Sequence, residues 1–271
     1  MSKVKELEFA SPGFRQRLRG MLGVDFYRLF HTPMYYIFLA IAAFIPAMIL
    51  GTSGSGGETS MYTNTWQMIA AEAPLYVVSD MGQYANMNMV FIFGGIMVSI
   101  FIGHDYRSGY VKQLFTTHAK KQDYMISKTL VSAFSMACMC ITYLIATVGT
   151  GIFVGASMEV NIGSLILAVV GKVVMSLGWA SLYTFLNIIF RRYFGISIAS
   201  SFFLGTGVLI IGAAAVVGNS SLLNLFLYGS SVYACLSADL MTVAVCLVVS
   251  LGWMLAYTLL GTLVLKRSDV Y

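Results

Sequence analysis

The most restrictive feature of this chain is a series of long apolar runs, each long enough to cross a lipid bilayer. A helix needs about 17–25 mostly apolar residues to cross the hydrocarbon layer. Only 10% of the 271 residues are charged, and the mean hydropathy is +0.81. Soluble domains carry about 25% charged residues, so this composition cannot supply a water-exposed surface. The predicted membrane spans are six, at residues 34–50, 86–103, 129–155, 164–190, 195–217 and 240–265.

These spans are expected to be helices, because lipid offers the backbone no hydrogen-bond partners outside the chain itself. The fold class predicted is therefore all-α integral membrane, with a single transmembrane domain over residues 1–271. Within it, residues 34–265 form the six-span bundle, preceded by an amphipathic segment at residues 1–33. Residues 266–271 form a tail.

The basic residues are divided unevenly between the two sides of these predicted spans. One side holds 15 of the 16, and the last, Lys172, lies inside the fourth span. The connecting segments on the other side carry acidic residues instead: Glu58, Glu72, Asp80, Glu159 and Asp239. Under the positive-inside rule, both chain termini are then cytoplasmic. The net charge of +5 needs no nucleic acid to explain it, because basic residues there meet anionic lipid headgroups.

Residues 12–31 form a candidate amphipathic helix before the first span. Apolar residues recur at helical spacing while arginines such as Arg15 lie mostly elsewhere; the apolar positions are Phe14, Leu18, Met21, Leu22 and Leu29. This pattern predicts an interfacial helix on the inner leaflet. The same helix can also offer a docking face to a cytoplasmic partner, and the two roles are compatible.

Residues 104–121, HDYRSGYVKQLFTTHAKK, concentrate charge between the second and third spans. In a helix, one side would carry Tyr110, Val111, Leu114, Phe115 and His118, and another would carry Lys112, Gln113 and Thr116. Ser108 can cap the start of such a helix, and Gly109 permits the turn out of span two. The pattern predicts a short helix that crosses beneath the membrane. An ordinary interfacial loop, basic because it is cytoplasmic, is the alternative.

Signatures of catalysis are missing from the sequence. Gly171-Lys172 resembles the end of a phosphate-binding loop, but Ile166 and Val173 stand where that motif needs glycine and Ser or Thr. The three histidines are distant from one another, and no HExxH or paired-carboxylate motif is present. We therefore predict no catalytic residue, no metal site and no cofactor bound by this chain.

Lys172 is the one charge well inside a predicted span. Placing a lysine there costs about 2.5–3.5 kcal/mol on insertion scales, so it should face protein or a wet cavity. It either lines a cavity, where it meets an anionic group of a substrate or holds a gate, or it has a structural role, in which it reaches outward or bonds helix carbonyls. Both interpretations stay open.

The segment after span two resembles that of ABC-2 type transporter permeases. The resemblance rests on Asp105-Tyr106-Arg107-Ser108-Gly109, on Lys120-Lys121-Gln122-Asp123-Tyr124, and on Lys128. In that family an acidic residue precedes a Ser-Gly turn. A segment with a basic residue, a tyrosine and a lysine then leads into span three. The closing residues 265–270 also resemble its basic-then-acidic tail. Asp105 replaces the usual glutamate, lysines replace the expected arginine, and His118-Ala119 stand where proline is frequent.

The resemblance implies a transport subunit without a nucleotide site of its own, in a bacterial cell membrane. ATP and Mg²⁺ would bind to two copies of a separate ATP-binding subunit, and a second permease, identical or related, would complete the pathway. The N-terminal helix and the helix after span two would contact that subunit. Coupling would involve Asp105, Arg107, Gly109, Tyr110, Lys112, Leu114, Phe115 and Lys128. Asp105 and Arg107 would pair with the partner or with each other, and Tyr110, Leu114 and Phe115 would supply buried contacts.

The function implied is ATP-driven export of an amphipathic or hydrophobic substrate, such as an antimicrobial peptide or an antibiotic. The 17 Met, 18 Phe and 16 Tyr suit an adaptable apolar pathway, and they suit plain lipid-facing helices equally well. Lipids and lipid-linked glycans, which family members also move, are the alternative substrates. An ATP-independent secondary transporter or channel is a different class, which predicts several ionisable residues inside the spans.

Overall fold

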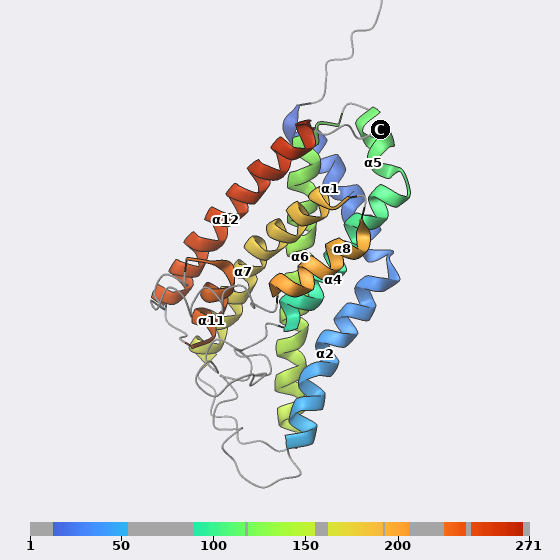
Figure 1. Ribbon diagram of the computed structural model, residues 1–271. Helices are drawn as coiled ribbons and strands as arrows, with labels where there is room; N and C mark the ends of the chain where they lie inside the picture. The colour runs from blue at the N-terminus through green and yellow to red at the C-terminus, as the bar shows by residue number, and fades with distance from the viewer. Residues whose placement is uncertain are drawn as a thin grey trace, which may run out of the picture.

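The computed structural model describes residues 13–53, 89–116, 119–154, 162–191, 193–205, 225–236 and 240–267 (Figure 1). All regular elements in these ranges are α-helices, which confirms the all-α part of the predicted fold class for the described residues. They are α1 (Phe14–Phe30), α2 (Pro33–Ser53), α4 (Met89–Arg107), α5 (Tyr110–Thr116), α6 (Lys121–Val154), α7 (Ile162–Ile189), α8 (Phe194–Gly205), α11 (Leu227–Leu236) and α12 (Leu240–Arg267).

Four of these helices are long and apolar enough to cross a membrane, judged by length and composition. They are α4 over Val90–Arg107, α6 over Lys121–Thr150, α7 over Val169–Ile189 and α12 over Leu240–Arg267. Helix α1 and the first part of α2 form a pair bent by 64°, which would count as a fifth span. Helix α8 is apolar but short, and residues 206–217 of the predicted fifth span lie outside the described residues. The count of six spans therefore stays a prediction.

The helices pack into one elongated bundle, with α6 and α7 in contact with most of the others (Figure 1). Its main apolar core is aromatic at the centre, where Trp179 of α7 stacks on Phe91 of α4 and on Tyr183. Glycines allow this close approach. A Cβ added to Gly95 of α4 would lie only 2.7–2.9 Å from the Tyr183 ring.

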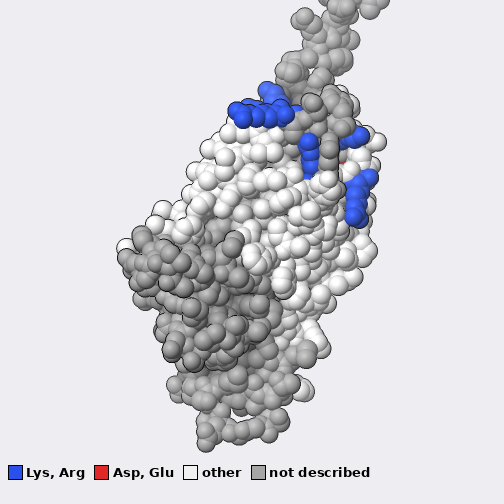
Figure 2. Space-filling model, in the orientation of Figure 1, with Lys and Arg blue, Asp and Glu red and all other residues white. Residues whose placement is uncertain are grey.

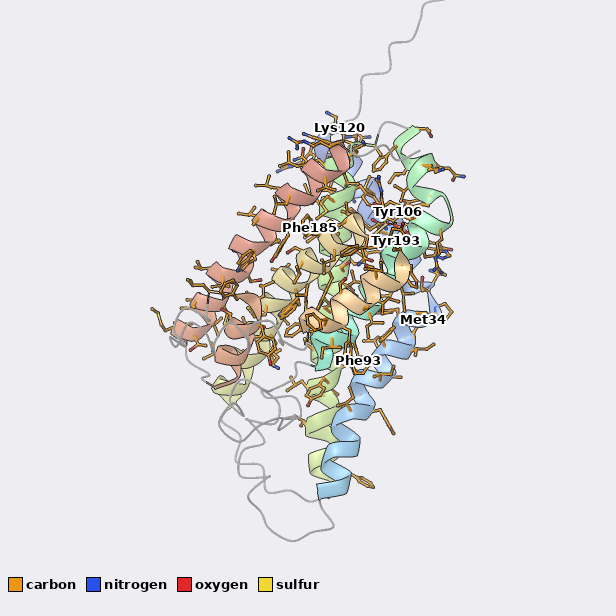
Figure 3. The ribbon with its side chains drawn as sticks, in the orientation of Figure 1. Met34, Phe93, Tyr106, Lys120, Phe185 and Tyr193 are labelled. Carbon is orange, nitrogen blue, oxygen red and sulfur yellow. The ribbon has the colours of Figure 1, made fainter. Side chains whose placement is uncertain are left out.

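A second, smaller apolar cluster lies where α1, α5, the start of α6 and the ends of α7 and α12 come together. Its buried members are Met21, Val111, Tyr124, Met125, Ile188 and Leu265. Exposed basic residues gather around it, and we call this end of the bundle the charged end (Figure 2). In Figure 3, Lys120 marks the charged end, and Phe93 of α4 lies well away from it.

Helix α1 occupies nearly the predicted range and buries most of the predicted apolar face, with an aspartate added to it. Its buried residues are Met21, Asp25 and Leu29, and this face packs against α6. Phe14 is 46% exposed, Arg15 is exposed, and Leu18 and Leu22 are partly buried. Asp25 can be buried on this face because its partners, Ser127 and Lys128, lie on α6. The spacing of residues within α1 alone cannot reveal such partners. The position of α1 relative to a membrane stays a prediction.

Candidate functional site

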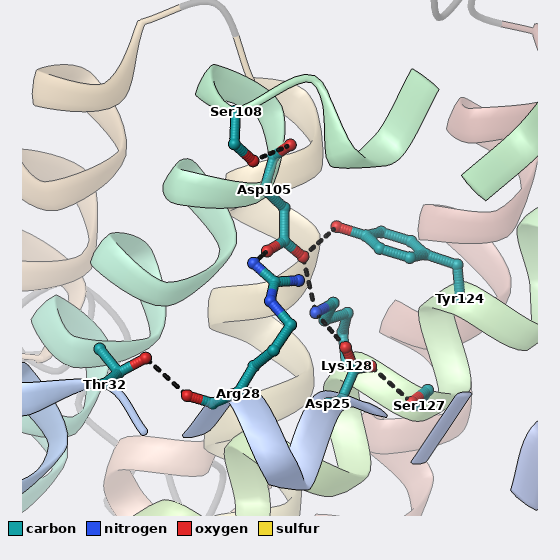
Figure 4. Close-up of polar contacts among 8 residues, drawn as sticks. All are labelled: Asp25, Arg28, Thr32, Asp105, Ser108, Tyr124, Ser127 and Lys128. Atoms are coloured by element: carbon teal, nitrogen blue, oxygen red, sulfur yellow. Dashed lines mark hydrogen bonds and ion pairs between the residues drawn. The ribbon is translucent and has the colours of Figure 1, made fainter. Parts of the chain in front are cut away.

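Four charged side chains form a buried network at the charged end, which we call the charge cluster (Figure 4). Its members are Asp25, Arg28, Asp105 and Lys128. Lys128 Nζ lies 2.6 Å from Asp25 Oδ1 and 2.6 Å from Asp105 Oδ2. Arg28 Nη2 donates to Asp105 Oδ1 at 2.5 Å. Two carboxylates thus balance two cations, which is the condition for burying charges that would otherwise be very costly.

Burial of the charge cluster is nearly complete. The side chains of Asp105, Asp25 and Lys128 are 0% exposed, and that of Arg28 is 22% exposed. Neutral hydroxyls supply further hydrogen bonds: Ser127 Oγ donates to Asp25 Oδ2 at 2.7 Å, and Tyr124 OH donates to Asp105 Oδ2 at 3.3 Å. Each carboxylate therefore has more than one partner, as buried ionised groups require.

Aromatic rings surround the two cations. Arg28 Cζ lies 4.2 Å from the centre of the Tyr110 ring, and Lys128 Nζ lies 4.6 Å from that of Phe101. Contacts of this kind attract a cation to the negative face of the ring. Burial, and then the nearby Asp25 carboxylate, raise the pKa of the Tyr110 phenol above its ordinary value near 10. Tyr110 is therefore a neutral ring at physiological pH.

The charge cluster joins helices that are far apart in the sequence. Helix α1 supplies Asp25 and Arg28, which lie three residues apart and so share one face. The last turn of α4 supplies Asp105, and the first turns of α6 supply Lys128. Helix α5 adds the ring of Tyr110, its first residue. All of these helices meet at one point.

A further ion pair extends the attachment of α1. Arg17 Nε lies 2.7 Å from Asp123 Oδ2 at the start of α6, and the aspartate side chain is only 2% exposed. Helix α1 therefore carries an ion-pairing residue near each of its ends and another in between. In the described part of the chain, the acidic residues are Asp25, Asp105 and Asp123, and all of them are buried in these ion pairs.

The turn from α4 into α5 depends on Gly109. Its φ of 73° is in the left-handed region, which glycine adopts without the strain that a Cβ would add. Ser108, expected to cap α5, has its Oγ directed back to the Asp105 carbonyl at 3.4 Å, so it closes α4 instead. The sequence correctly placed a short helix after this glycine, and its range is Tyr110–Thr116.

Helix α5 has the two sides that the sequence predicted. Val111 is 1% exposed, and Leu114 and Phe115 pack against the second apolar cluster. The other side, with Lys112, Gln113 and Thr116, is exposed. The apolar side was expected to supply contacts with a partner subunit, whereas the structure packs it against this chain's own bundle. His118 lies outside the described residues.

The sequence predicted that Asp105 and Arg107 pair either with the partner subunit or with each other, and the structure contradicts the second possibility. Asp105 bonds Arg28 and Lys128, while the Arg107 guanidinium lies 4.2 Å from the ring centre of Phe194 in α8. The two side chains separate because Asp105 points into the bundle and Arg107 is exposed. Lys128, expected at a contact with the partner, is enclosed within this chain.

Sequence reasoning missed Asp25, Arg28 and Ser127 as members of this site. One signal was available: Asp25 is the only acidic residue in residues 13–33, and it lies within an otherwise basic helix. A lone aspartate at a position that helical spacing turns inward predicts a buried cation as its partner. Its partner is not identifiable without the fold.

A second buried polar group lies deeper in the bundle, between α4, α7 and α8. Asn187 Nδ2 donates to Ser99 Oγ at 3.1 Å, and Asn187 Oδ1 accepts a hydrogen bond from Ser197 Oγ. Ser99 Oγ lies 3.1 Å from Ser201 Oγ. These bonds hold the three helices together. Lys172 of α7 is 8% exposed, so it faces protein; whether it lines a pathway stays a prediction. Within the described residues, no three His, Cys, Asp or Glu side chains are grouped to hold a metal ion.

Comparison with known families identifies the family of this chain. The family described as ABC-2 family transporter protein matches residues 22–208, well over half of the chain. This chain belongs to the ABC-2 transporter family. The ABC-2 permease is therefore a multi-pass membrane subunit that does not hydrolyse ATP itself. The matched range contains the whole charge cluster and α5. Comparison with curated proteins finds no match.

Proposed function

We propose that this ABC-2 permease is the membrane subunit of an ATP-driven exporter, and that a separate ATP-binding subunit docks at its charged end. The observation that carries this proposal is the attachment of α5. This helix shows a polar side to the exterior, while its other side packs against the bundle and contacts the charge cluster. Force applied to such a helix reaches the bundle directly.

The charged end faces the cytoplasm in this proposal, which places both termini there. The exposed charged residues of the described chain support this orientation, because all of them are basic; they are Arg15, Arg19, Arg107, Lys112, Lys120, Lys266 and Arg267. Basic residues are retained on the cytoplasmic side of membrane proteins.

ATP and Mg²⁺ bind to the partner subunit rather than to this chain. Two ATP-binding subunits act with two permeases, identical or related, and their closure on ATP moves the cytoplasmic helices. The exposed side of α5, together with the exposed start of α1, provides the contact.

The substrate is an amphipathic or hydrophobic molecule, such as an antimicrobial peptide or an antibiotic. The interior of the bundle supports this class, because Met97, Met136 and Met139 are buried among aromatic rings, and methionine adapts to irregular apolar partners. Lipids and lipid-linked glycans are the competing class. Stimulation of ATP hydrolysis by each class, in the purified complex, separates them.

Co-purification tests the docking proposal. The wild-type permease should bring down an ATP-binding subunit, and Lys112→Glu on the exposed side of α5 should lower the recovered amount about fivefold or more. Lys266→Glu is the matched control, since it makes the same change at an exposed residue of the charged end on α12. Equal recovery with Lys112→Glu and with wild type would refute docking through α5. A wild-type chain that recruits no ATP-binding subunit would refute the proposed function as a whole.

A further inference from the structure

Two aromatic residues connect helix α5 to the charge cluster: Tyr110 contacts it directly, and Phe115 contacts it by way of Tyr124. The Tyr110 ring centre lies 4.2 Å from Arg28 Cζ and 5.7 Å from Lys128 Nζ, so one ring serves both cations. The Phe115 ring meets Tyr124 edge to face at 5.7 Å between centroids. Tyr124 in turn donates its hydroxyl to Asp105. Each aromatic contact therefore leads to a different part of the same ion network.

These contacts are sensitive to the position of α5. A cation is attracted to a ring only within about 6 Å of its centre, and the attraction is strongest where water is excluded. Lys128 already lies 5.7 Å from the Tyr110 ring centre, so a movement of α5 by a few ångströms would remove this contact and weaken the closer one to Arg28.

The connection between α4 and α5 permits such a movement. The two helices are separated by Ser108 and Gly109 alone, and Gly109 has φ 73° with no atom within 4 Å of where a Cβ would stand. Ser108 is exposed and the space beside Gly109 is open, so the bundle does not enclose this turn. Helix α5 is held in place by the side that packs against the bundle. On that side, Tyr110 is the residue that contacts the charge cluster directly.

Lys128 connects the charge cluster to the longest helix of the structure. Helix α6 runs without interruption over the 34 residues Lys121–Val154, about 50 Å at 1.5 Å per residue. A change in the partners of Lys128, near one end, changes how α6 is held against α1 and α4. Because α6 is one continuous helix, a tilt there displaces its opposite end.

We propose that Tyr110 is a positioning residue that couples α5 to α6. With α5 seated, its ring stabilises Arg28 and Lys128 between the two aspartates and holds α6 against α1 and α4. Displacement of α5 removes the ring, the ion pairs rearrange, and α6 tilts. This inference rests on the proposed function, because the ATP-binding subunit supplies the displacement.

The test places a reporter at the far end of α6. Phe153 is 92% exposed there, so Phe153→Cys can carry an environment-sensitive fluorophore, with the four native cysteines replaced by alanine. The full chain is purified with its ATP-binding subunit, and fluorescence is recorded on addition of Mg²⁺-ATP. Tyr110→Phe keeps the ring, and Tyr110→Leu removes it. Tyr193→Leu, at a 63% exposed tyrosine, is the matched control.

We expect Tyr110→Phe and Tyr193→Leu to respond to ATP as the unsubstituted reporter chain does. In Tyr110→Leu the fluorescence change on addition of ATP should be smaller by about fivefold or more. The reason is that about 1 kcal/mol of cation–π attraction corresponds to roughly a fivefold change in an equilibrium. Recovery of the ATP-binding subunit by Tyr110→Leu should be unchanged, since Tyr110 lies on the inner side of α5.

The outcomes separate this inference from the proposed function. Normal recruitment with a normal ATP response in Tyr110→Leu would overturn the coupling role of Tyr110 and leave the proposed function standing. An equal loss in Tyr110→Phe and Tyr110→Leu would also overturn it, because the ring is retained in the first. A chain that recruits no ATP-binding subunit at all would overturn the proposed function and this inference together.

Discussion

Lys128→Met tests whether the charge cluster stabilises the charged end as the ion pairs suggest. Methionine keeps the approximate length of the lysine side chain and removes its charge. The substitution leaves Asp25 with only the Ser127 hydroxyl as a side-chain partner, and Asp105 with Arg28 and Tyr124. Two buried carboxylates then face one remaining cation.

The expected cost follows from this imbalance. Removing one partner of a buried ion pair typically destabilises a protein by about 3–5 kcal/mol, because a charge is left uncompensated. For a chain of this size, each kcal/mol lowers the melting temperature by about 2–4 °C, so a fall of about 6–20 °C is expected. Adding Asp25→Asn removes the unpaired charge and should recover about 1–3 kcal/mol of that loss.

The assay follows unfolding in detergent with a dye that reacts with thiols, because Cys140 and Cys246 are buried and become reactive as the bundle opens. Lys112→Met makes the same chemical change at an exposed lysine and should leave the melting temperature nearly unchanged. A Lys128→Met chain that melts within about 2 °C of Lys112→Met would refute the reasoning. So would a double variant no more stable than Lys128→Met.

Two further predictions concern glycines. Gly95→Ala should destabilise the bundle by about 1–3 kcal/mol, because its methyl would meet the Tyr183 ring, whereas Gly252→Ala, with nothing within 4 Å, should leave the melting temperature equal or slightly higher. Equal effects of both would contradict close packing at Gly95. Gly109→Val should strain the turn before α5 by about 1–2 kcal/mol or more and speed trypsin cleavage after Lys112, while Gly109→Asn should do so less. Identical cleavage rates for the two variants would contradict the left-handed turn.

Hydropathy predicted where the long helices lie, but it placed their ends inside the apolar runs and missed the charged turns beyond them. The predicted span at residues 129–155 corresponds to α6, which begins eight residues earlier, at Lys121. Likewise the predicted span at residues 86–103 corresponds to α4, which continues to Arg107. In both cases the turns that were missed contain charged residues, namely Asp123, Lys128 and Asp105. Hydropathy excludes such residues from a buried helix, and only their ion-pair partners explain their burial.

The apolar runs by themselves determined that the described chain is helical and where its main helices lie, because burial in lipid or in a bundle depends chiefly on local apolar content. The short helix after Gly109 and its two sides were also predictable, since both follow from residues that are neighbours in sequence. Only the tertiary structure decided that α1 inserts Asp25 and Arg28 beside Lys128 and Asp105. A buried charge is stable only with its counter-charge, and here that counter-charge lies about a hundred residues away along the chain.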